Sequence, residues 1–151
     1  MIQRHPSFEH FDFTESYIDV PEISQTSIRV PVRKFVILGG HPDYPKTTHF
    51  KRCVLVFEKV VSSKRNVSKY GAPKEKDNKL IYDIESEYEV SDGPFEQVEE
   101  EVFLHHLAGV FGVPEVPHGW LNWDIVASSV RMEDIEVDTT PRKPDMGSIY
   151  R

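Results

Sequence analysis

The stretch from residue 119 to residue 132 reads GWLNWDIVASSVRM and is the best guide to the fold. Apolar Leu121, Trp123 and Ile125 alternate in it with polar Asn122 and Asp124. This period of two sends one set of side chains into a core and the other toward water, so we expect a β-strand. Burying an indole removes about 150–250 Å² of surface from water. We therefore expect Trp123 to lie in the core, with neighbouring strands closed over it.

The length and composition predict one globular domain. A chain of 151 residues is close to the commonest domain size, and its 38 % hydrophobic and 28 % charged residues are typical of a soluble protein that buries a core. We expect the domain to span residues 1–138. The last segment, 139–151, holds Pro141, Pro144 and Gly147 and offers little to bury, so we expect a mobile tail.

Charge and cysteine content narrow the class of partner and the compartment. A formal net charge of −7 disfavours nucleic acid and anionic membranes, because both attract a concentrated Lys/Arg surface. No segment approaches the ~20 apolar residues that cross a bilayer, and the opening residues do not resemble a signal peptide. The single cysteine, Cys53, lies in an apolar run and is expected to be a buried hydrophobe. We expect a cytoplasmic protein.

Alternation elsewhere in the chain predicts more strands. They fall at about residues 14–20, 28–38, 50–61, 80–90 and 133–137, with turns at 62–66 and 91–94. Residues 95–111 fit two readings. A helix near 95–107 would place acidic residues in its first turns, whereas a strand from 101 to 111 would have apolar residues on both faces, and we favour the strand.

Seven to eight strands without long intervening helices predict an all-β fold, an antiparallel β-sandwich or a flattened barrel. The alternative is an α+β fold with one helix near 95–107. Three long loops, 39–49, 71–79 and 112–119, alternate with the two short turns. If every strand reverses direction, these three loops meet at one end of the domain, where binding sites are commonly built.

That loop cluster would gather possible ligands. His41, His49 and His118 with the carboxylate of Asp43 could bind a transition metal such as zinc, and Tyr44 with Trp120 could contact a small ligand. The spacing does not single out a metal, because the chain contains no His-x-His, no HExxH and no set of cysteine ligands. We keep this metal- or small-ligand-binding protein, which could be an enzyme, as the alternative function.

Catalytic motifs are missing, since the chain has neither a GxSxG nor an SxxK sequence. The strongest polar feature is an acidic strip on the strand at 80–90, formed by Asp83, Glu85, Glu87 and Glu89. An acidic strand face can raise the association rate and the specificity for a basic partner. We therefore expect a non-catalytic interaction module without a cofactor, which presents these four carboxylates to a protein partner.

Overall fold

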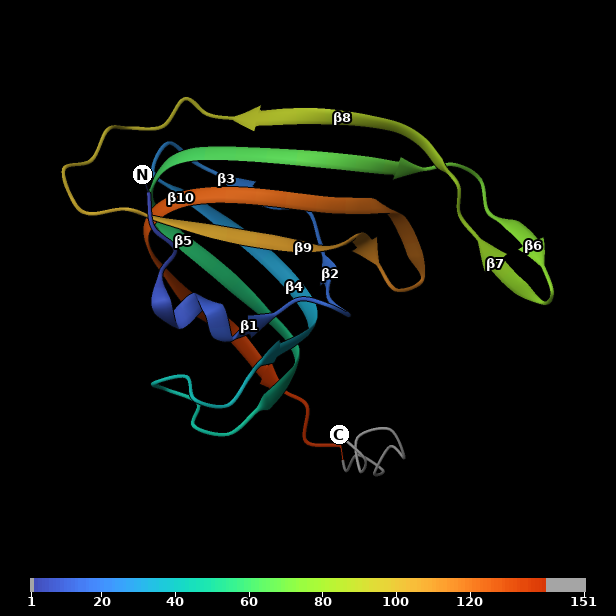
Figure 1. Cartoon of the computed structure of the whole chain (residues 1–151), viewed down its shortest axis with the longest axis horizontal. Helices are drawn as coiled ribbons and strands as arrows, with labels where there is room; N and C mark the ends of the chain where they lie inside the picture. The colour runs from blue at the N-terminus through green and yellow to red at the C-terminus, as the bar shows by residue number, and fades with distance from the viewer. Residues whose placement is uncertain (1, 141–151) are drawn as a thin grey trace.

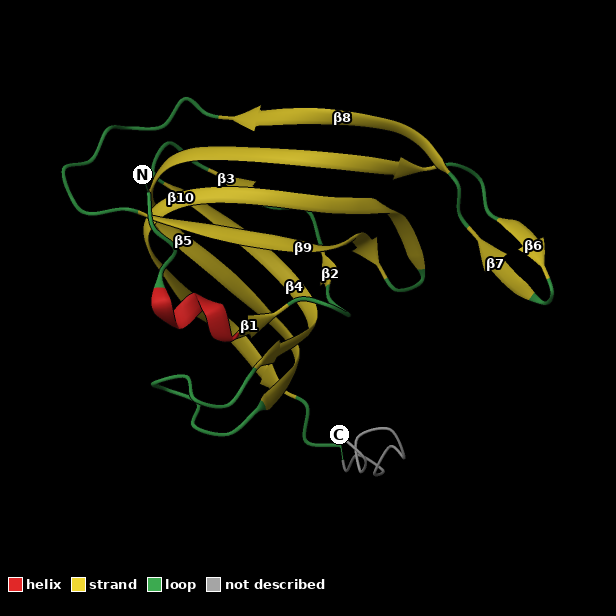
Figure 2. Ribbon diagram, viewed as in Figure 1, coloured by secondary structure: helices red, strands yellow, loops and turns green. Residues whose placement is uncertain are grey.

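The computed structural model describes residues 2–140, and strands dominate them (Figures 1 and 2). One short 3-10 helix, η1, precedes the strands. The elements are η1 (Pro6–His10), β1 (Phe11–Asp12), β2 (Tyr17–Ile18), β3 (Glu22–Ile23), β4 (Ser27–Ile37), β5 (Thr48–Tyr70), β6 (Lys74–Lys76), β7 (Lys79–Ile81), β8 (Ile84–Asp92), β9 (Phe103–Val113) and β10 (Val116–Val137). The all-β prediction is confirmed.

Strand pairing closes the main sheet on itself. β4 pairs with β5, β5 with β10 and β10 with β9, and the two-residue strand β2 joins β9 back to β4. The β2–β9 pairing is parallel, whereas the others in this ring are antiparallel. At the closure, a Cβ on Gly109 would lie 2.9 Å from the carbonyl oxygen of Ser16. The absence of a side chain at Gly109 thus lets β2 approach β9, and the result is a flattened barrel.

The two long strands, β5 and β10, carry the core. Trp123 is fully buried, as predicted, and Leu121 and Ile125 beside it on the same face of β10 are buried too. From β5 and β4 the main apolar contributors to the interior are Phe35, Phe50, Leu55, Phe57, Ile28 and Ile37. Each strand has a bulge where it pairs with the other, which bends the pair and lets one ladder wrap around this core.

The predicted turn at 62–66 is wrong, because β5 runs without a break from Thr48 to Tyr70. Residues 63–66 of β5 pair with β10 on one side and with β8 on the other. Their polar side chains have the composition of a turn, but these residues are part of the strand. In the fold the Ser63 side chain is buried and hydrogen-bonded, so the strand continues through it.

Two predicted loops contain strand. Residues 71–79 include β6 and the start of β7, which form a small hairpin around Asp77 and Asn78, both with positive φ. Residues 112–119 form the tight β9–β10 connection, because β10 already begins at Val116. The predicted strand at 80–90 is correspondingly divided, since β7 ends at Ile81 and β8 begins at Ile84.

The helix near 95–107 is also wrong, and the favoured strand is confirmed as β9, Phe103–Val113. His105 and Leu107 of β9 are fully buried on the barrel side, while His106 between them is exposed. The predicted mobile tail, 139–151, lies outside the described residues apart from Thr139 and Thr140. Within residues 2–140, no helix is long and apolar enough to cross a membrane.

Candidate functional site

Three of the four residues of the acidic strip lie on β8, which forms one edge of the main sheet (Figure 1). All four predicted residues, Asp83, Glu85, Glu87 and Glu89, are exposed. In the ladder with β5, Glu87 lies opposite Ser68 and Glu89 opposite Asn66. Because side chains alternate along a strand, Glu87 and Glu89 point to the same face of the sheet.

A bulge separates the other two residues from this pair. Lys69 of β5 lies opposite Ser86, but Tyr70 lies opposite Ile84, so Glu85 is the extra residue of β8. Asp83 precedes β8, and its carboxylate forms a 2.9 Å ion pair with Lys74 of the β6–β7 hairpin. The strip is therefore not one continuous ladder. We use the name acidic edge for the three members that lie on β8: Glu85, Glu87 and Glu89.

The acidic edge lacks compensating cations. Within residues 2–140, none of its three carboxylates forms an ion pair; the one side-chain hydrogen bond reaches Glu87, from the Ser68 hydroxyl at 3.3 Å. Several acidic groups on the barrel are paired: Arg131, for example, contacts both Glu58 and Glu133. The three carboxylates of β8 thus form a line of negative charge without a paired cation.

A partly buried polar network holds β8 in place at its C-terminal end. The carboxylate of Asp92 accepts hydrogen bonds from Ser63 Oγ at 2.6 Å and from Arg65 Nε and Nη2 at 3.0 and 2.6 Å. The Ser63 hydroxyl in turn accepts one from the indole of Trp123 at 2.7 Å. The guanidinium of Arg65 also lies over the Trp123 ring, 5.0 Å from its centroid. The edge strand is therefore tied directly to the core.

Sequence reasoning missed this network. Ser63 and Arg65 are in the run that resembled a turn, and Asp92 is in the predicted turn after the acidic strand. The one signal available was the alternation of Ser63, Arg65 and Val67, which continues the period of β5.

Three residues of the alternative site do come together. His41, Asp43 and Tyr44 line a pocket of about 420 Å³ that also contacts Met132 of β10. The backbone N–H of Asp43 donates to His41 Nδ1 at 3.0 Å. Burial lowers the pKa of His41 below its usual value, although the carboxylate of Asp43 acts in the opposite direction. The Tyr44 ring packs on His41 and on Phe50, so it is part of the wall.

The structure does not bring the rest of the alternative site to this pocket. His49 lies at the start of β5, whereas His118 precedes Gly119, which pairs with Lys69 near the other end of β5. Trp120 is next to that second end. The predicted loop cluster was wrong because it required the chain to reverse direction at 62–66. Without that turn, loops 39–49 and 71–79 lie at opposite ends of one strand. Within residues 2–140, no three His, Cys, Asp or Glu side chains are placed to hold a metal ion.

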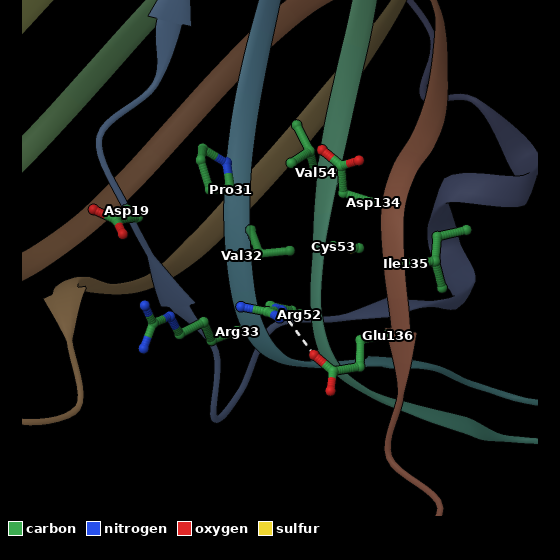
Figure 3. A pocket seen from close by; sticks show the side chains of 10 residues that line it. All are labelled: Asp19, Pro31, Val32, Arg33, Arg52, Cys53, Val54, Asp134, Ile135 and Glu136. Atoms are coloured by element: carbon green, nitrogen blue, oxygen red, sulfur yellow. Dashed lines mark ion pairs between the residues drawn. The ribbon is translucent and has the colours of Figure 1, made fainter.

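A second pocket, of about 400 Å³, lies where β10 bulges away from β5 (Figure 3). Asp134 and Ile135 of β10 oppose Cys53 alone, which opens the surface there. Arg52 and Glu136 meet across its rim in a 2.7 Å ion pair. The thiol of Cys53 is buried, as predicted, and burial raises its pKa to about 12. The thiol is therefore protonated near neutral pH and unsuited to nucleophilic attack.

Comparison of the chain with protein-family models, with curated proteins and with solved structures finds no match. Of the surfaces described above, the acidic edge combines exposure, uncompensated charge and a firm attachment to the core.

Proposed function

We propose that this protein is a non-catalytic interaction module of the cytoplasm, which binds a basic protein partner through the acidic edge. The observation that carries the proposal is the set of three exposed carboxylates on β8 that lack ion pairs within the described chain. A free, buried cysteine is compatible with a reducing compartment.

The electrostatics favour fast and selective association. Carboxylates that are already paired on their own surface offer little to a partner, whereas unpaired ones attract Lys and Arg side chains during the encounter. The anchor at Asp92 limits the movement of β8, so that less conformational entropy is lost on binding. The net charge of −7 adds a field of the same sign at longer range.

The test is capture of partners from a native extract. Immobilised wild-type protein is compared with the triple variant Glu85→Gln, Glu87→Gln, Glu89→Gln, and bound proteins are identified by mass spectrometry. We expect a basic protein that the triple variant retains at least about tenfold less. Its retention should also fall as salt rises from about 0.05 to 0.5 M, because above about 0.1 M the attraction between exposed charges reaches less than about 10 Å.

A matched control separates this edge from net charge. The variant Glu96→Gln, Glu99→Gln, Glu101→Gln also removes three exposed carboxylates, from the segment between β8 and β9, and should leave capture unchanged. If capture survives in the triple variant, or does not respond to salt, the acidic edge is not the binding surface. Loss of capture in Trp120→Ala, with capture retained in the triple variant, would instead place binding on β10, where Trp120 lies opposite Ser68 of β5.

A further inference from the structure

We propose that the partner docks as an extended segment that adds one strand to the free edge of β8, and that this segment alternates basic and apolar residues. The choice of a basic segment rests on the proposed function; the mode of docking rests on the sheet. β8 pairs with β5 on one side, and within residues 2–140 no strand pairs with its other side (Figure 1). Unpaired edges of this kind are templates for strand addition.

The direction of the β8 peptide groups follows from antiparallel pairing, in which alternate residues turn their N–H and C=O toward one neighbour and then the other. The N–H of Val110 in β9 points away from β10, because it donates at 3.1 Å to the segment that precedes β2. Trp120 lies opposite Val110 and therefore directs its N–H and C=O toward Ser68 of β5. The N–H and C=O of Ser68 in turn point toward β10 and away from β8. It follows that Glu87, opposite Ser68, presents its own N–H and C=O to the free edge.

The same period of two exposes the peptide groups of Glu89 and turns those of Tyr88 toward β5. Glu87 and Glu89 therefore offer both backbone groups and carboxylates to an added strand. On the other face, Tyr88 is 48 % exposed. An added strand would place alternate side chains beside the glutamates and the remaining ones on the face of Tyr88, so basic residues suit the first set and apolar residues the second.

A second copy of this chain is a poor occupant. Antiparallel pairing of β8 with β8 of another copy, centred on Tyr88, would place Glu87 directly opposite Glu89 of that copy on the same face. Like charges directly opposite each other are destabilising in a sheet. Charge complementarity therefore selects a foreign, basic segment.

Two synthetic peptides test the mode of docking on the intact protein. One alternates Lys and Val over eight residues with capped ends, and the other has the same composition with four Lys followed by four Val. We expect the alternating peptide to bind at least about tenfold more tightly. It should also slow hydrogen exchange at the amides of Glu87 and Glu89, measured by NMR, and leave the amide of Tyr88, which already faces β5, unchanged.

Two variants at one position separate the backbone from the charge. Glu89→Ala and Glu89→Pro both remove the carboxylate, but only proline removes the edge N–H and blocks an incoming strand. Proline is tolerated on edge strands where the N–H faces solvent, and near-UV circular dichroism verifies that the Trp123 environment is retained. We expect the proline variant to bind the alternating peptide at least about fivefold more weakly than the alanine variant.

Equal affinities for the two peptides, or equal affinities of the two Glu89 variants, would overturn strand addition. Neither result would contradict the proposed function, because the capture experiment in the extract tests that function separately. Capture that survives in the triple variant, together with the expected peptide behaviour, would support strand addition at an edge whose natural partner does not use the glutamates. Unchanged exchange at Glu87 and Glu89 with peptide bound would also contradict the proposal.

Discussion

The indole Nε1 of Trp123 donates a 2.7 Å hydrogen bond to Oγ of Ser63, a residue sixty positions earlier in the chain. Both side chains are buried, so neither group reaches water. The same hydroxyl donates to Asp92 at the end of β8. The central residue of the core and the strand that carries the acidic edge therefore share one hydrogen-bonded atom.

Replacing Ser63 tests this relationship. Ser63→Ala leaves the buried indole N–H without an acceptor and removes one donor from Asp92, so we expect the free energy of unfolding to fall by about 1–3 kcal/mol. Urea denaturation followed by tryptophan fluorescence measures it. Ser91→Ala, at an exposed site on β8, is the control and should cost less than about 0.5 kcal/mol. Equal costs for the two substitutions would show that the buried bond contributes nothing.

Asp92 should be coupled energetically to Arg65. Asp92→Asn keeps the size of the side chain but weakens two charge-assisted hydrogen bonds to the half-buried guanidinium, for an expected loss of about 1.5–3 kcal/mol. In a double-mutant cycle with Arg65→Met, the two losses should overlap, with a coupling of about 1 kcal/mol or more. Additive losses would contradict a direct interaction. Exchange at the amides of β8 should also speed up in the single variants.

His105 should make stability fall in acid. Burial lowers its pKa to about 4, its Nδ1 donates to the Ile125 carbonyl oxygen at 3.3 Å, and its buried Nε2 has no partner within the described residues. Below pH 6.5 the unfolded chain takes up a proton at this site that the folded chain accepts only near pH 4. Stability is therefore full above pH 6.5 and is lost as the pH falls toward 4, by about 3 kcal/mol from this group.

The measurement for His105 is the free energy of unfolding at several pH values between 7 and 4. His105→Asn, which cannot titrate, should show a shallower decline over this interval than the wild type. His5 stacks on His105 at 6.3 Å, so His5→Gln is the companion variant and should retain the steep decline. Parallel curves for the wild type and His105→Asn would exclude the effect.

Metal analysis addresses the alternative function. Because His49 and His118 lie near opposite ends of β5, we expect protein purified without a tag or chelator to contain less than about 0.1 equivalent of zinc, iron, nickel or copper. Atomic emission spectrometry measures it. A stoichiometric metal that is lost in the His49→Ala, His118→Ala double variant would contradict this expectation and revive a site shared by these two residues.

Local patterns in the sequence predicted what depends on a single strand. Alternation around Trp123 indicated which residues of β10 are buried. Adjacent residues of a strand point to opposite faces, and in β9 His105 is buried while His106 is exposed. The placement of Glu87 and Glu89 on one face of β8 follows from the same rule. Each of these properties depends on the period of two, which the sequence displays directly.

The tertiary structure alone decided what depends on distant partners. The polar residues from Ser62 to Asn66 have the composition of a turn, and they are strand because Trp123 and Asp92 satisfy Ser63 from other parts of the chain. That single outcome sent loops 39–49 and 71–79 to opposite ends of β5 and separated the predicted metal ligands. β5 also lies between β10 and β8, and no described strand pairs with the other side of β8, so β8 is an edge. Hydrogen bonds between strands sixty residues apart leave no periodic trace in the sequence, so they appear only when the chain is folded.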